Sequence, residues 1–273
     1  MPELPEVEVT RRGVAPYLQD QRVTDVTMRR SGLRWPFPTD LAKSLRGQQI
    51  TSIGRRGKYL LINFAHGTVL IHLGMSGHLR ILPSQTPATK HDHIDIVVGA
   101  QLLRMNDPRR FGAVLWHPAS DGFIENHLLL RNLGVEPLEE KFDAKLLYQQ
   151  SRQRHSAIKQ VLLAGDIVVG VGNIYASESL FKARINPKIA ANRISLARYT
   201  LLAKAIRETL AAAIVQGGSS LRDFVAVNGQ SGYFQQSYFV YDRCDKPCKV
   251  CGAPIRQIKQ GQRSTFYCVN CQK

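Results

Sequence analysis

The sequence contains no uninterrupted apolar run long enough to span a bilayer, although 44% of its 273 residues are hydrophobic. Nor do the first twenty residues contain the continuous apolar segment of a secretory signal. Four acidic residues fall among them: Glu3, Glu6, Glu8 and Asp20. We find no internal repeat and no low-complexity tract. These absences predict a soluble, cytoplasmic protein with no membrane partner, and the length suggests two domains.

Acidic residues are scarce. The chain has 21 Asp and Glu against 37 Lys and Arg, a formal net charge of +16 and a pI near 9.9. An excess of this size favours a polyanionic partner, with nucleic acid ahead of an anionic membrane surface. A generally basic soluble protein is the alternative explanation of the charge.

Cysteine is also rare, and four of the five cysteines form one pattern. Cys248-x-x-Cys251 and Cys268-x-x-Cys271 are separated by sixteen residues, the spacing of two knuckles that share one tetrahedral Zn²⁺. Apolar stretches flank a Gly261 turn between them, so we expect a β-hairpin zinc ribbon. Four thiolates leave no open position for substrate water, and the predicted zinc is structural. Cys244 is left as a free thiol.

Short β-rich runs separated by turn residues fill the first half of the chain, a pattern typical of an antiparallel sandwich or barrel. The expected strands are 23–28, 49–53, 59–64, 68–72, 79–82, 93–98, 101–105 and 112–116. A short helix over 6–18, interrupted by Gly13 and ended near Pro16, precedes them.

Helical periodicity replaces the strands after a segment, 126–140, that we interpret as helix, turn and linker. Helices are expected at 143–151, 155–164, 173–182 and 195–216, with a further short helix from Ser219 and a polar loop at 228–232. The predicted fold is α+β and two-lobed. Its domains are 1–133, a helical domain at 134–240 that begins with a linker region (134–151), and a ribbon at 241–273.

The chain opens Met1-Pro2-Glu3, and removal of Met1 would make the secondary amine of Pro2 the terminus. An α-amino group has a pKa of about 7.7–8.0, so roughly a quarter is unprotonated near neutral pH. Such an amine can attack an aldehyde-level carbon and form an iminium ion, while the Glu3 carboxyl passes a proton to the displaced oxygen. The alternative is that the terminus is only a stiff extended arm.

Three other stretches suggest contacts with DNA. Gly170–Tyr175 places two glycines before a helix start, with Asn173 at the cap position, where backbone N–H groups attract anions. Met75 and the Arg109–Phe111 stretch lie on turns between strands, where exposed side chains could act as wedges in a duplex. His91, His93 and Asp95 alternate along one strand, and we favour hydrogen-bonding or phosphate-contact roles for them over a metal site.

Together these residues resemble the bacterial formamidopyrimidine-DNA glycosylases, which excise 8-oxoguanine and ring-opened purines. The resemblance covers nearly the whole chain. It rests on motifs in order along the sequence: 1–8, 57–60, 72–77, 90–93, 107–112, 169–178 and the four cysteines. It implies an N-terminal β-sandwich, a helix-two-turn-helix, a zinc ribbon and double-stranded DNA with oxidised purines or abasic sites, bound between two lobes by a monomer.

The resemblance also implies roles for matching residues. Pro2 would be the Schiff-base nucleophile and Glu3 its proton donor, with Lys58 assigned to β-elimination and Arg263 to δ-elimination. Met75, Arg109 and Phe111 would fill the void left by the flipped base, with Arg109 facing the orphaned cytosine. DNA contacts are implied for His72, His91, Arg154, Lys159 and Asn173. The lesion pocket is implied for Glu6, Glu178, Ser219, Ser220, Arg222 and Tyr233.

Two stretches depart from the family pattern. Gln160 stands where proline is expected, and 241–245 replaces glycines before the ribbon. Two alternatives remain open: an endonuclease VIII type enzyme that acts on oxidised pyrimidines, and a non-catalytic zinc-ribbon DNA-binding protein. Leu4 and the complete void-filling set favour the purine-specific enzyme over the first alternative.

Overall fold

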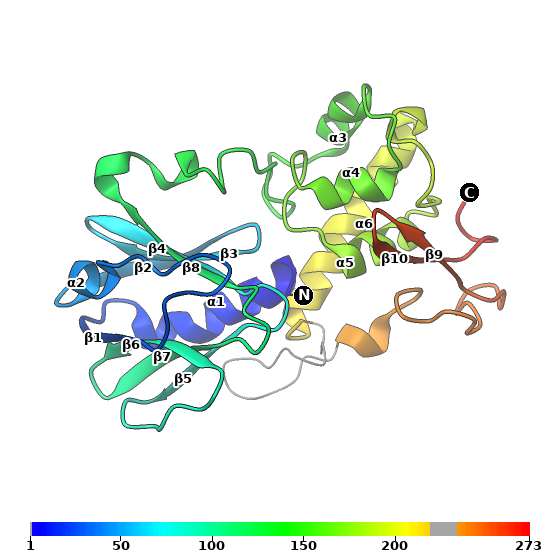
Figure 1. Ribbon diagram of the computed structural model, residues 1–273. Helices are drawn as coiled ribbons and strands as arrows, with labels where there is room; N and C mark the ends of the chain where they lie inside the picture. The colour runs from blue at the N-terminus through cyan, green and yellow to red at the C-terminus, as the bar shows by residue number, and fades with distance from the viewer. Residues whose placement is uncertain (1, 219–233) are drawn as a thin grey trace. The chain divides into compact units, whose positions relative to one another are not determined.

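The computed structural model describes residues 2–218 and 234–273, which divide into two compact units (Figure 1). The first unit consists of residues up to 131 with 216–218, and the second of 132–215 with 234–273. Among these described residues no helix is both long and apolar enough to cross a bilayer. The domain limits at 133/134 and 240/241 remain predictions of the sequence.

Helix α1 (Leu4–Leu18) opens the first unit and is longer than predicted. It begins as soon as Glu6 can accept a hydrogen bond from the Glu3 N–H, at 2.8 Å, which is one half of a capping box. It also continues through Pro16. Proline has no backbone N–H to donate. Because Pro16 lies in the last turn, the helix loses only one hydrogen bond, near its end.

Two four-stranded antiparallel sheets follow, as the sequence predicts. One has the order β1-β6-β7-β5 and the other β2-β3-β4-β8. The strand bounds are β1 Val23–Met28, β2 Ile50–Arg56, β3 Tyr59–Phe64, β4 Gly67–His72, β5 His78–Pro83, β6 Asp92–Val98, β7 Gln101–Asn106 and β8 Ala113–Pro118. Each lies within two residues of its expected position at both ends except β2, which extends three residues further toward the Lys58 turn.

A single apolar core joins α1 to both sheets. Its buried members include Val7 and Val14 of α1, Leu60 and Ile62 of β3, and Ile96 of β6. Helix α2 (Leu41–Leu45), which the sequence did not indicate, buries its two leucines in the same core. This core gives the strand ends and the start of α1 a rigid base.

The helix expected within 126–140 does not form. Two 3₁₀ turns, η1 (Ala119–Asp121) and η2 (Ile124–Asn126), are followed by further turns up to the second unit. Gly122, with a φ of 93°, breaks the chain direction between them.

Four helices build the second unit: α3 (Ala144–Ser151), α4 (Ile158–Ala164), α5 (Asn173–Lys182) and α6 (Leu196–Val215). The predicted apolar face of α6 is buried at Tyr199, Leu202 and Ile206, but Leu196 at its first position is exposed. The short turns η3 (Ala191–Arg193) and η4 (Phe234–Ser237) complete this unit together with the ribbon. The helix expected from Ser219 and the loop at 228–232 lie outside the described residues.

The C-terminal hairpin pairs β9 (Arg256–Gln260) with β10 (Arg263–Tyr267). Gly261 and Gln262 both have positive φ, 50° and 64°, which defines a two-residue type I′ turn. This turn places Arg263 at the tip of the hairpin, as the sequence predicts.

Candidate active site and zinc centre

The N-cap and the first turn of α1 are buried although they carry two carboxylates. Pro2 is buried, and Glu3 and Glu6 are 2% and 0% exposed. Gly218 lies against Glu6, since a Cβ on Gly218 would stand 3.1 Å from Glu6 Oε1. Gly218, the last described residue before position 219, therefore lies beside the Glu6 carboxylate. Ser219, Ser220, Arg222 and Tyr233, all predicted for the lesion pocket, lie outside the described residues.

Glu8 ties α1 to the turn that carries Lys58. Its carboxylate accepts Arg55 Nε at 3.1 Å, and Arg55 Nη1 donates to the Gly57 carbonyl at 2.9 Å. Gly57 has a φ of 56°, so Gly57 and Lys58 form the tight turn between β2 and β3. One ion pair thus sets the Lys58 turn against the helix that begins next to Pro2.

Glu8 stays ionised in this position. Burial alone would raise its pKa, but hydrogen bonds from Arg11 and Arg12 and the charges of Arg11 and Arg55 outweigh that effect and lower the pKa to about 2. Arg11 Nη2 and Arg12 Nε each donate to Glu8 Oε1 at 2.8 Å. The contact between α1 and β2 therefore keeps its charge throughout the neutral range.

His72, at the end of β4, is neutral near pH 7. Burial, followed by the charges of Lys58 and Arg34, lowers its pKa to about 4. Its Nδ1 accepts the Gly74 N–H at 3.1 Å, so the ring hydrogen lies on Nε2. His72 can offer a phosphate oxygen a neutral N–H donor, which is compatible with its predicted DNA contact.

Met75, Arg109 and Phe111, here called the wedge trio, lie on two turns that run side by side. The turn at 73–77 leads from β4 to β5, and the turn at 107–112 leads from β7 back to β8. Each connects one sheet to the other. We call them the crossover turns.

Strand pairing holds both ends of the crossover turns. His72 pairs with Ala113 at one end and His78 with Asn106 at the other. Met75 and Phe111 are 37% and 45% exposed, unusual for such side chains. The Arg109 guanidinium lies 4.9 Å from the Phe111 ring centre. The sequence-predicted trio is therefore assembled on one rigid platform.

Arg34 belongs to the same surface, and the sequence reasoning missed it. Its N–H donates to the Gly112 carbonyl at 3.1 Å, its side chain is exposed, and its charge contributes to the low pKa of His72. The Arg34-Trp35 pair in a loop is the sequence signal that could have indicated Arg34. In the structure its guanidinium lies 4.8 Å from the centre of the indole ring, a cation–π contact.

The alternating residues on β6 have structural partners. His93 is 3% exposed and its Nε2 donates to the Asp107 carbonyl at 2.8 Å. Asp95 forms a buried ion pair with Arg104 at 2.7 Å and a second with Arg29 at 2.5 Å. His91, which precedes the strand, is partly exposed. Only His91 of this group retains a surface position suited to phosphate contact.

In the second unit, two predicted DNA-contact residues hold the ribbon hairpin. Lys159 is 0% exposed and donates to the Ser264 carbonyl at 3.0 Å and to Thr265 Oγ1 at 2.7 Å. Asn173 Nδ2 donates to the same carbonyl at 3.0 Å. These bonds fix the strand next to Arg263, which is exposed.

Asn173 does not cap its helix as predicted. Gly172 takes the N-cap position and Asn173 is the first residue of α5. The Asn173 side chain instead donates an Nδ2 hydrogen to the ribbon backbone. Arg154, predicted to contact DNA, is exposed and pairs with Asp166 at 2.5 Å.

Glu178, predicted for the lesion pocket, faces the backbone that leads into the ribbon. It is 2% exposed, and its two oxygens accept the N–H groups of Phe239, Val240 and Tyr241 at 2.8–2.9 Å. Burial raises the pKa of Glu178, and this effect outweighs the three hydrogen bonds, which lower it. A buried carboxyl with three backbone donors fixes the chain at this point.

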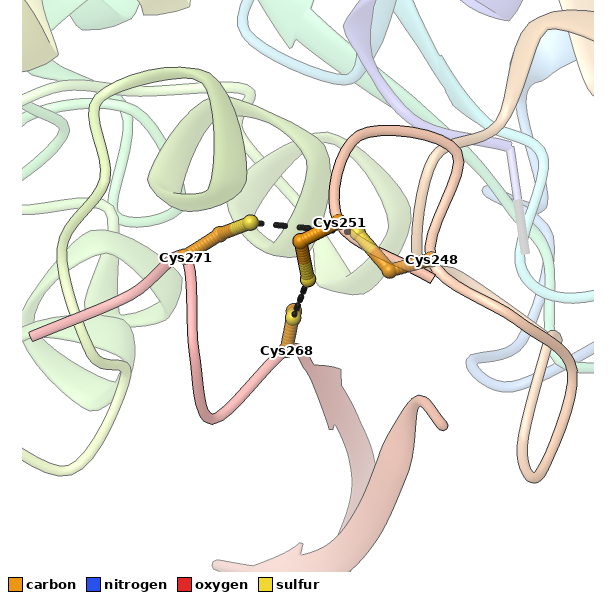
Figure 2. Close-up of side chains that lie close together, drawn as sticks. All are labelled: Cys248, Cys251, Cys268 and Cys271. Atoms are coloured by element: carbon orange, nitrogen blue, oxygen red, sulfur yellow. Dashed lines mark hydrogen bonds between the residues drawn. The ribbon is translucent and has the colours of Figure 1, made fainter. Parts of the chain in front are cut away.

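The four predicted ligands gather at one place in the ribbon (Figure 2). Their sulfur atoms all lie within 4.8 Å of one another, with Cys248 and Cys271 at 3.9 Å and Cys251 and Cys268 at 3.5 Å. A tetrahedral ZnS₄ site with Zn–S bonds of about 2.3 Å has sulfurs roughly 3.8 Å apart. The residues fit one Zn²⁺, and Cys244 lies outside the cluster.

These features define a class of protein: a DNA-binding enzyme that joins a β-sandwich to a helical domain and a zinc ribbon. Three family models match the chain. They are described as formamidopyrimidine-DNA glycosylase N-terminal domain over residues 1–114, formamidopyrimidine-DNA glycosylase H2TH domain over 133–225, and zinc finger found in FPG and IleRS over 245–273.

Whole-chain similarity agrees with the three models. A formamidopyrimidine-DNA glycosylase of a Janthinobacterium species is 72% identical over 273 residues and one of Paraburkholderia phytofirmans is 59% identical, each with full coverage of both chains. A mutant of the Lactococcus lactis enzyme in complex with Fapy-dG-containing DNA superposes with a TM-score of 0.92 at 34% identity and full coverage. The Thermus thermophilus protein superposes with a TM-score of 0.89 at 34% sequence identity, and the match covers 99% of this chain and 98% of that one.

The chain belongs to the formamidopyrimidine-DNA glycosylase family. It is a DNA repair glycosylase with abasic-site lyase activity, and its cysteine cluster is a zinc site. The fold class predicted from the sequence is confirmed.

Proposed function

We propose that this enzyme excises 8-oxoguanine and formamidopyrimidines from double-stranded DNA through a Schiff base on Pro2 and then cleaves the strand by β,δ-elimination. The observation that carries the proposal is the link from α1 to the Lys58 turn through Glu8 and Arg55. It sets the turn that carries the Lys58 cation against the helix that begins beside the Pro2-Glu3 terminus. The enzyme would act as a monomer on chromosomal DNA in the bacterial cytoplasm.

The first chemical step uses the terminal amine. The unprotonated Pro2 nitrogen attacks the sugar C1′ and the bond from C1′ to the damaged base breaks. Pro2 loses its N–H proton, which neutralises the departing base. The buried Glu3 carboxyl donates a proton to the ring oxygen as the sugar opens, and an iminium ion remains between Pro2 and C1′.

Strand cleavage follows from the iminium. It withdraws electrons, so a proton is lost from C2′ and the bond from C3′ to its phosphate breaks. In a second elimination a proton is lost from C4′ and the bond from C5′ to its phosphate breaks. Lys58 and Arg263 would each offset the charge of a departing phosphate. Water then releases Pro2 from the sugar fragment.

The substrate class is supported by the wedge trio and by the relatives. A flipped nucleotide leaves a gap in the duplex, and the exposed Met75 and Phe111 side chains suit that gap. Solved Lactococcus lactis relatives hold Fapy-dG and abasic-site DNA. Excision from 8-oxoguanine and thymine glycol duplexes, measured side by side, distinguishes this proposal from the endonuclease VIII alternative.

Borohydride trapping tests the nucleophile. Protein whose Met1 removal is verified by mass spectrometry should form a covalent adduct with lesion duplex, mapped to Pro2. Pro2→Gly should slow excision by about a hundredfold or more, which corresponds to about 2.7 kcal/mol of barrier. Pro5→Ala, a proline change three residues away, should still form the adduct. Absence of any adduct with the processed parent protein would refute the Schiff-base mechanism.

A further inference from the structure

The crossover turns share a fully buried acid that the proposed chemistry does not use. Asp107 is 0% exposed. Its Oδ1 accepts the Ser76 hydroxyl at 2.7 Å, and its Oδ2 accepts the Gly112 N–H at 2.8 Å. One carboxylate therefore joins the turn that bears Met75 to the turn that bears the rest of the wedge trio.

Ser76 also links Asp107 to the backbone of Arg109. A carboxylate can only accept, so the single hydroxyl hydrogen of Ser76 must point at Asp107. A lone pair of the same oxygen accepts the Arg109 N–H at 3.2 Å. Ser76 is 2% exposed, so water cannot readily replace either bond. The position of the Arg109 main chain is thus set from the neighbouring turn.

The two turns also touch backbone to backbone. Gly74 has a φ of 64°, and a Cβ there would lie 2.4 Å from the Phe111 carbonyl carbon and 2.5 Å from the Gly112 nitrogen. Arg110 adopts a φ of 60°, a conformation that non-glycine residues rarely take. Since strained backbone persists only where its surroundings hold it, the contacts between the turns must maintain this geometry.

We propose that Ser76 and Asp107 are positioning residues that set the enzyme's discrimination between bases opposite the lesion, acting through Arg109. The inference rests on the proposed function, in which Arg109 faces the base left unpaired. Met75 and Phe111 occupy space and are indifferent to which base that is. The guanidinium instead donates directional hydrogen bonds, and their strength depends on where the Arg109 backbone is held.

The test measures kcat/KM for 8-oxoguanine opposite cytosine and opposite adenine, in the parent enzyme and in Ser76→Ala. Loss of one positioning hydrogen bond, roughly 1.4 kcal/mol, should reduce the cytosine-to-adenine ratio about tenfold. Asp107→Asn should act in the same direction, because an amide presents only one acceptor oxygen to the two donors. Ser52→Ala is the matched control, since Ser52 also has a side-chain hydrogen-bond partner, Asn63 at 2.9 Å, but lies at an exposed position of β2.

Arg109→Ala supplies the background that separates positioning from general stability. If Ser76 acts through Arg109, Ser76→Ala should leave the ratio unchanged once Arg109 is absent, whatever it does to the thermal midpoint. An unchanged ratio in folded Ser76→Ala and Asp107→Asn proteins would overturn the inference. So would an equal drop in the ratio in the presence and the absence of the Arg109 side chain.

Failure of the positioning role of Ser76 and Asp107 can be distinguished from failure of the proposed function. A parent enzyme that excises 8-oxoguanine and forms the Pro2 adduct retains the proposed function even if Ser76→Ala discriminates normally. A parent enzyme that excises nothing from this duplex contradicts the proposed function itself. Circular dichroism of each variant identifies any protein that has not folded, in which case the other variant decides the question.

Discussion

The N-terminal unit and the zinc ribbon hold their functional side chains by different means. In the first unit, the core that supports the Lys58 and wedge-trio turns has 23 buried apolar residues among those described. The ribbon that presents Arg263 packs around six, two of which are zinc ligands. A small element with so little apolar surface needs another source of stability, and the metal supplies it.

Removal of zinc is expected to act on the ribbon alone. Chelation should disorder the hairpin and release Arg263, lowering affinity for lesion duplex by at least about tenfold, or 1.4 kcal/mol. Fluorescence anisotropy with labelled duplex measures this loss, and added Zn²⁺ should restore binding. The near-ultraviolet signal of Trp35 and Trp116, both in the first unit, should persist. Full affinity in metal-free protein would contradict the comparison.

A buried ion pair provides the corresponding weak point in the first unit. Arg104 is 1% exposed and bonds Asp95 as well as the carbonyls of Thr86 and Pro87. Arg104→Met would leave a buried carboxylate short of its main partner, at an expected cost of about 3–5 kcal/mol.

Denaturant unfolding at neutral pH measures that cost. Arg29→Met removes a partly exposed partner of the same Asp95, so its loss should be smaller, about 1 kcal/mol. Equal losses for the two arginine variants would show that burial does not determine the strength of these pairs.

The sequence predicts the two units unequally well. The strand positions follow from alternation and turns, and the zinc ligands from spacing, because both patterns are local. What local pattern cannot predict is the partner of a buried polar group. Lys159 and Asn173 were expected to contact DNA and Glu178 to line the lesion pocket. The local pattern did not show that each also bonds ribbon or adjacent backbone more than 60 residues away in the sequence.

The wedge trio illustrates the opposite case. The motif locates its residues, but only the sheet topology brings the two crossover turns together. The Asp107 carboxylate that joins them carries no signal in the sequence beyond its place in an Asp-Pro turn. Arg34 was missed for the same reason, since its contact with Gly112 spans 78 positions.

Acid should weaken the first unit through Glu8. Its folded-state pKa, about 2, lies below the ordinary value of 4.5, so its contribution is fully present above pH 4.5 and is lost as the pH falls toward 2. The shift corresponds to about 3 kcal/mol. The difference in unfolding free energy between the parent and Glu8→Gln should therefore be near that value at pH 7 and shrink toward pH 2. Glu125→Gln, at an exposed position, is the control, and a pH-independent difference for Glu8→Gln would contradict the assignment.

Cys244 gives the smallest and most specific test of the ribbon. Its thiol donates to the Asp245 carboxylate at 3.2 Å, and that hydrogen bond raises its pKa. In the zinc-loaded protein, iodoacetamide should modify Cys244 alone, and Asp245→Asn should speed that reaction a few-fold because more thiolate forms. Mass spectrometry identifies the modified residue, while metal analysis of Cys244→Ser should still find one zinc per chain. Loss of zinc from Cys244→Ser would mean that the fifth cysteine supports the metal site, and that the ribbon depends on more than its four clustered sulfurs.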